Sequence, residues 1–136
     1  MKKTVKILSL SLMLVLCVLM LASCGAPNSN PDDALAALKD NDYKAAIKDS
    51  TITPTILAGL GIADVDCVVS ASGIKDEKFE SVTIVYFESS EKANDAWEKM
   101  QKYADDKKDE DAEDWVCKKS GKMIYFGTPN AIKAAK

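Results

Sequence analysis

The first residues of the chain form a segment that is not expected to belong to a folded domain. Lys2, Lys3 and Lys6 make this start cationic. No acidic residue precedes Asp32, and residues 7–22 are apolar except for two serines. This run of sixteen residues, two serines included, is shorter than the roughly 18–20 that a membrane-spanning helix requires. It suits the apolar core of an export signal, so the segment predicts a protein that leaves the cytoplasm.

Leu21-Ala22-Ser23-Cys24 ends this run and resembles the lipobox of bacterial lipoproteins. The resemblance implies a signal peptide over residues 1–23, cleavage between Ser23 and Cys24, and a diacylglyceryl group on the Cys24 thiol. Ser23 departs mildly from the pattern, because glycine or alanine is commoner there. Two or three acyl chains anchor a protein stably where one does not. We therefore expect the protein on the cell membrane, facing outside the cytoplasm. An uncleaved signal anchor would show the same apolar run.

The composition of the residues after the predicted signal peptide narrows the possible classes of function. Removal of residues 1–23 leaves 113 residues, with fifteen lysines against 21 acidic residues, which is the size of one domain. Net negative charge argues against nucleic acid as a partner. The chain has no histidine, the commonest general base and zinc ligand. It also has no arginine, the preferred clamp for phosphate and carboxylate groups.

No motif predicts a metal or another cofactor. Residues 105–114 are densely acidic, but they lack the alternating ligands and central glycine of an EF-hand calcium loop. A solvated helix end followed by a loop is the expected structure there.

The residues after Cys24 divide into a tether and a domain. Residues 24–31 are small, polar and interrupted by proline, which is typical of a flexible tether. Residues 32–136 are expected to form a single α+β domain.

The apolar periodicities predict the elements of this domain. In order, these are a helix over 31–39, a strand or continued helix over 43–48 with strand favoured, a helix over 53–60, strands over 65–71 and 81–87 around a loop at 73–78, a helix over 89–107, a hairpin over 115–126 and a last helix over 129–135. This order predicts a two-layer sandwich, with an antiparallel sheet of about four to five strands, one long amphipathic helix and short flanking helices. The segment Tyr125-Phe126-Gly127-Thr128 and the strand-helix-hairpin core resemble small uncharacterised lipoproteins of Gram-positive bacteria. That resemblance supplies no catalytic residues.

Cys67 and Cys117 are a possible disulfide, because an exported domain permits one. Alternation places Cys67 on the face of Val65 and Val69, and Cys117 on the face of Trp115. Unpaired core cysteines are the alternative, and burial is expected either way.

Val68, Val85 and Phe87 are a candidate interaction face. They share one face of the predicted hairpin with Ser70, Ser81 and Thr83, and one long helix covers only one face of a sheet. An apolar patch left open in this way often marks a binding site. The alternative is that the short helices close over the patch and make it a second core layer.

These features favour a membrane-anchored, non-catalytic binding module whose partner is an unknown protein or envelope ligand. A small cell-envelope enzyme using carboxylate chemistry is an alternative. No spacing singles out an acid and base pair, so no catalytic residue is assigned. An accessory solute-binding subunit is a further alternative, although such receptors usually close two domains on a ligand.

Overall fold

The computed structural model describes residues 25–48, 57–108 and 114–136. Ser23, Cys24 and the first half of the helix expected over 53–60 lie outside the described residues; residues 57–59 form a helical turn.

The sheet is antiparallel, with five strands in the order β1-β2-β3-β5-β4, and the α+β class is confirmed. The strands are β1 (Lys44–Lys48), β2 (Val65–Lys75), β3 (Lys78–Phe87), β4 (Val116–Ser120) and β5 (Met123–Gly127). Besides the helical turn at 57–59, the helices of the described ranges are α2 (Pro31–Asp40), α4 (Ser90–Lys107) and α5 (Pro129–Ala134). Residues 44–48, left between strand and helix by the sequence, form the edge strand β1.

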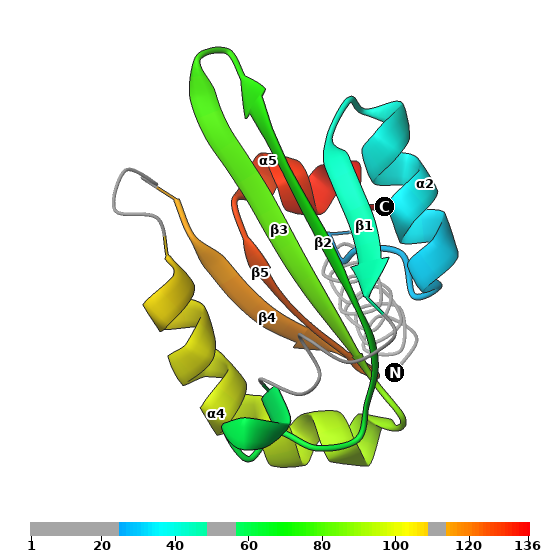
Figure 1. Ribbon diagram of the computed structural model, residues 1–136, viewed down its shortest axis with the longest axis vertical. Coiled ribbons are helices and arrows are strands. Elements are labelled where there is room, and N and C mark those ends of the chain that lie inside the picture. The colour runs from blue at the N-terminus through cyan, green and yellow to red at the C-terminus, as the bar shows by residue number, and fades with distance from the viewer. Residues whose placement is uncertain (1–24, 49–56, 109–113) are drawn as a thin grey trace, which may run out of the picture.

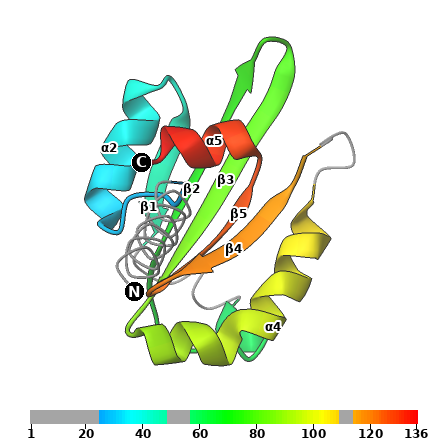
Figure 2. The ribbon, with the colours of Figure 1, turned by 180° about the vertical axis from the view of Figure 1, so that it is seen from behind.

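Helices lie on both faces of the sheet (Figure 1). The long helix α4 packs over β3, β5 and β4 on one face, here called the front. Helix α2 packs over β1 and β2, and α5 over β3 and β5, on the back. Figure 2, seen from behind, shows α5 crossing the sheet on that side. The expected pairing of sheet and long helix is therefore present, and the short helices add a layer behind it.

Local capping explains where two of the helices begin. The Asn30 side chain accepts a hydrogen bond of 2.9 Å from the backbone N–H of Asp32, and Pro31 occupies the first helical position of α2. The Ser89 hydroxyl accepts a bond of 3.2 Å from the backbone N–H of Lys92 at the start of α4. Both satisfy amide groups that the first helical turn leaves without intrahelical partners, so both predicted helix starts are confirmed.

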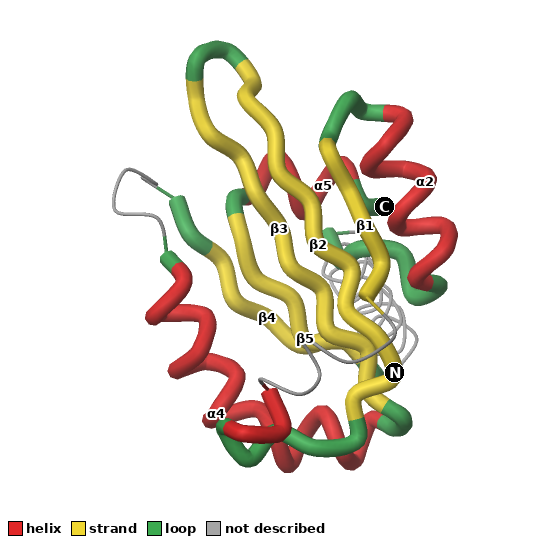
Figure 3. Tube along the Cα trace, in the orientation of Figure 1, coloured by secondary structure: helices red, strands yellow, loops and turns green. Residues whose placement is uncertain are grey.

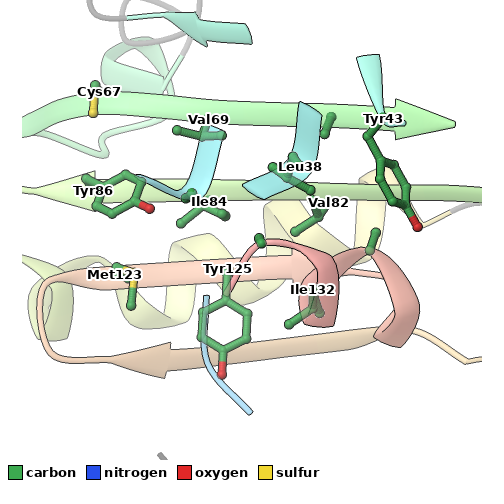
Figure 4. Packing of buried hydrophobic residues seen from close by; sticks show 14 residues of the cluster. Leu38, Tyr43, Cys67, Val69, Val82, Ile84, Tyr86, Met123, Tyr125 and Ile132 are labelled. Carbon is green, nitrogen blue, oxygen red and sulfur yellow. The ribbon is translucent and has the colours of Figure 1, made fainter. Parts of the chain in front are cut away.

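The back core joins the sheet to α2 and α5. Figure 4 shows Leu38 of α2 and Ile132 of α5 reaching toward the strands. The strand residues on this face are Cys67, Val69, Ala71, Val82, Ile84, Tyr86, Met123 and Tyr125. Successive strand residues point to opposite faces, so the neighbours of these residues form the front core.

The front core contains the three residues that the sequence offered as an interaction face. Val68, Val85 and Phe87 are each 1 % exposed and pack with Met100 and other α4 residues. The interaction-face hypothesis is therefore wrong. Helix α4 covers the face of these three residues, while α2 and α5 close the opposite face.

The β2–β3 hairpin is longer than predicted. A loop was expected over residues 73–78, but the strands continue to Lys75 and Lys78. Asp76 and Glu77 make the turn with φ angles of 51° and 65°. This left-handed geometry is the usual one for a tight hairpin, yet it normally recruits glycine or asparagine. The absence of those residues is why the turn was not recognised.

The predicted tether is bound to the domain from Ala26 onward. Ala26 packs against the back core, and Pro27 is buried. The Asn28 N–H donates to the Ala135 carbonyl at 2.8 Å, and the Tyr86 hydroxyl donates to the Asn28 carbonyl at 2.8 Å. The prediction of a flexible tether over 24–31 is therefore wrong for these residues, because the composition did not reveal their partners on the domain.

Candidate functional site

The front of the sheet is covered over only part of its length. Figure 1 shows α4 along its lower and left part, while no described helix lies over the front of β1 or the upper part of β2 and β3. We call this uncovered area the open face. Its residues are Lys44, Ala46 and Lys48 of β1, Ser70, Ser72 and Ile74 of β2, and Phe79, Ser81 and Thr83 of β3.

The strand register arranges the open face in rows. Ser70 lies opposite Thr83, and Ser72 lies opposite Ser81. Lys44 is the partner of Ser72 on the other side, in the edge strand β1. Directly opposed residues in an antiparallel pair have Cβ atoms about 4.5–5.5 Å apart. The rows therefore bring four hydroxyl groups close together beside a cation.

Two apolar side chains extend the open face at the hairpin tip. Ile74 lies opposite Phe79, and they are 75 % and 51 % exposed. Figure 3 shows this end of the hairpin projecting past the rest of the sheet. A half-exposed phenyl ring is therefore placed next to the hydroxyl rows, on the same face.

The open face is hollowed beside β1. The hollow has a volume of about 580 Å³, and five of its lining residues belong to the open face and carry polar side chains: Lys44, Lys48, Ser70, Ser72 and Thr83. Its lining also includes Lys39 and the back-core residues Tyr43, Ala71 and Val82. Within the described part of the chain, no hydrogen bond engages the five polar side chains of the open face that line the hollow, and the one ion pair is Lys92 with Asp64.

Aromatic side chains border the hydroxyl rows where α4 meets the sheet. Phe126 of β5 lies opposite Thr83. The ring of Tyr103 contacts that of Phe126 edge-on at a centroid distance of 5.9 Å, and the Trp115 ring is 6.0 Å from it. This cluster marks the boundary between the covered and uncovered parts of the front.

The two domain cysteines are not joined to each other. Cys67 belongs to the back core, whereas Cys117 packs against the front core. Strands β3 and β5 separate their strands, which puts β2 and β4 about 14 Å apart at about 4.8 Å per strand. A disulfide requires Cα atoms closer than about 7 Å. Cys67 is buried as expected, and Cys117 is half-buried.

Glu80, Tyr86 and Cys117 lie outside the open face and are buried or half-buried in the domain. Glu80 is 6 % exposed; its Oε1 accepts from the Asn130 side chain at 3.3 Å, and its Oε2 has no described partner. Burial raises the pKa of Tyr86, and the nearby Cys67 adds to this rise. Burial likewise raises the pKa of Cys117, with a smaller contribution from the charge of Asp105. Both groups therefore stay protonated at neutral pH.

No group of three or more His, Cys, Asp or Glu side chains in the described ranges is placed to hold a metal ion. None of the described helices has the length and apolar character that a membrane crossing requires.

Sequence reasoning missed the open face although it had the right alternation. It placed Ser70, Ser81 and Thr83 on one face with Val68 and Val85, as the register confirms. It did not reveal that the character of this face changes along the strands. The face is apolar at the end under α4 and polar at the other end, which no described helix covers. The change from valine to serine and threonine within each strand was the available signal.

No protein-family model, curated protein or solved structure matches the chain.

Proposed function

We propose that the protein is a lipid-anchored, extracytoplasmic binding module that presents the open face to a ligand of the cell envelope. The lipobox-like Leu21-Ala22-Ser23-Cys24 supports the location and the anchor. The open face supports the binding role, and it is the observation on which the proposal depends.

The composition of the open face favours recognition of a polar ligand. Lysines and hydroxyls supply hydrogen-bond donors, and hydroxyl oxygens also accept. Groups on a rigid sheet are already ordered. Binding therefore does not incur the conformational-entropy cost of ordering a mobile loop. The hollow beside β1 lies next to these groups.

Fatty-acid labelling tests the anchor. Cells that express the wild-type chain and are grown with a labelled fatty acid should yield a labelled protein. Cys24→Ala should abolish the label and leave a longer, unprocessed precursor, because the acceptor thiol is gone. Label that persists in this variant would exclude the proposed lipidation.

Photo-crosslinking on intact cells tests the binding role. A photoreactive residue in place of Ser72, at the centre of the open face, should form adducts with envelope material. The matched control is the same residue in place of Lys118, which is exposed on β4 at the other edge of the sheet. Equal adduct formation at both positions would contradict a binding role for the open face.

A further inference from the structure

We propose that the ligand of the open face is an acidic polysaccharide, an extended chain of sugar rings that carry anionic groups. This inference rests on the proposed function. It follows from three features of the open face: its charge, its hydroxyl rows and its apolar end.

The charge of the open face is opposite to that of the chain as a whole. Without residues 1–23 the net charge is −6, yet the three strands place Lys44 and Lys48 on the open face and no carboxylate. Acidic side chains elsewhere repel anions, so a local cationic area directs an anionic ligand to this face. Lysine binds anionic oxygen as a point charge with three donors.

The spacing of the groups fits a chain better than a single small molecule. Lys44 and Lys48 are four residues apart in one strand, and so are Phe79 and Thr83, which corresponds to about 13 Å in each case. A ligand that contacts both lysines therefore carries repeated negative charges. The four hydroxyl groups of the open face, on Ser70, Ser72, Ser81 and Thr83, donate hydrogen bonds to the hydroxyl groups of a sugar and accept hydrogen bonds from them.

Phe79 and Ile74 give the open face a surface for an apolar ring face. They lie in line with Ser81 and Ser72 along the same two strands. Aromatic rings favour flat apolar partners with a polar rim, and the C–H face of a sugar ring is such a partner. An anionic chain without rings would leave this pair unused.

Two other partner classes fit less well. Serine, lysine and alanine, which make up much of the open face, are depleted in protein–protein interfaces. An anionic membrane surface would meet Asp76 and Glu77 at the hairpin tip before Ile74 and Phe79, and these carboxylates would be repelled.

Titration calorimetry of the full chain in neutral detergent tests the proposal. An oligomer of galacturonic acid is the probe, and a galactose oligomer of equal length is the neutral control. We expect the acidic oligomer to bind at least about tenfold more tightly, because charge-assisted hydrogen bonds are the stronger kind. Binding should weaken with added salt, as the Debye length falls from about 10 Å at 0.1 M to about 3 Å at 1 M.

Variants separate the contributions of the open face. Lys44→Glu with Lys48→Glu should weaken binding about tenfold or more. The matched control, Lys118→Glu with Lys122→Glu, makes the same charge change at exposed positions of the β4–β5 hairpin and should leave binding unchanged. Phe79→Ala with Ile74→Ala should weaken binding of the acidic oligomer but not that of inorganic polyphosphate, which has no ring.

Each contrary result has a defined meaning. Equal effects of the two lysine pairs, or binding of polyphosphate or anionic vesicles in preference to the acidic oligomer, would overturn the polysaccharide proposal. So would self-association through the open face that excludes the oligomer. The proposed function survives these results if Ser72-specific adducts form on cells, and it fails separately if they do not.

Discussion

Gly127 lies where the backbones of β5 and β3 leave no room for a side chain. Its φ angle is 149°, and a Cβ atom there would lie 2.2 Å from the Ser81 carbonyl oxygen and 2.7 Å from the Val82 Cα. Thr128, the next residue, donates its N–H to the same Ser81 carbonyl at 2.8 Å. The approach joins β3 to the start of α5, so it fixes the back layer against the sheet.

Gly127→Ala should destabilise the protein strongly. The added methyl group has no room against backbone atoms, and the φ angle disfavours any side chain. We expect a loss of about 2–4 kcal/mol of unfolding free energy, measured by urea denaturation. Gly59→Ala is the control, because a Cβ at that position meets nothing within 4 Å. Equal stability of the two variants would contradict the close approach.

The cysteines should react slowly with a thiol reagent in the native protein. Cys67 is buried, and the raised pKa of Cys117 lowers the fraction of reactive thiolate at neutral pH. Cys117 should react faster as the pH rises toward its pKa, while Cys67 should require unfolding. Mass spectrometry of alkylated, non-reduced protein measures both rates. A disulfide between them, seen as failure of both to react even in denaturant, would contradict the strand order.

At the scale of elements, each long strand divides into two parts on its front side. Val68 and Val85 lie under α4, whereas Ser70 and Thr83, two residues further along the paired strands, lie on the open face. Burial of valine is favourable by about 1.5–3 kcal/mol per side chain. The front face is therefore core at one end and available surface at the other.

Charged substitutions should distinguish these two parts. Val85→Asp with Phe87→Lys places charges among residues that are 1 % exposed, which should cost several kcal/mol and largely unfold the domain. Ser81→Asp with Thr83→Lys, on the same strand and the same face, should leave the protein folded. Circular dichroism during thermal unfolding compares the two. A folded first variant would show that α4 does not cover this part of the sheet.

The sequence predicted the helices and strands better than the contacts between them. Alternation along β2 and β3 correctly identified which residues share a face from Cys67 onward, and Ser89 correctly marked the start of α4. The placement of Val65 with Cys67 was wrong, because a bulge between Val65 and Cys67 shifts the register and puts Val65 on the front. Neither signal indicates which face α4 covers, because Val69 and Val68 are equally suited to burial. The docking of Asn28 was also beyond sequence reasoning, since its partners Tyr86 and Ala135 are distant in the chain.

At the scale of the whole molecule, the bound segment leaves little free chain between a lipid on Cys24 and the domain. Ala26 already packs against the back core, so the two intervening steps of backbone reach about 7 Å at most. Figure 1 shows the hairpin tip at the top of the molecule and the start of α2 lower down, on the right. The proposed anchor would therefore hold the side of the domain at the start of α2 close to the membrane.

Lipid crosslinking tests this placement. A photoreactive residue at Lys136, next to the Ala135 carbonyl that binds Asn28, should label membrane lipid, because it lies beside the segment that the proposed anchor would hold at the membrane. The same residue at Lys78, near the hairpin tip, should not. Insertion of a long Gly/Ser segment after Gly25 should reduce labelling from Lys136. Equal labelling from both positions in the uninserted protein would contradict the bound tether.

The short span between Cys24 and Ala26 also bears on how anchored copies would act together. With so little slack, every copy would hold its open face at a similar height, so neighbouring copies would meet the same thin layer of the envelope. One polymer strand crossing that layer would contact several copies, and the second contact is made at a high effective concentration. Retention of the strand would then rise steeply with the surface density of the protein, even where a single contact is weak and short-lived.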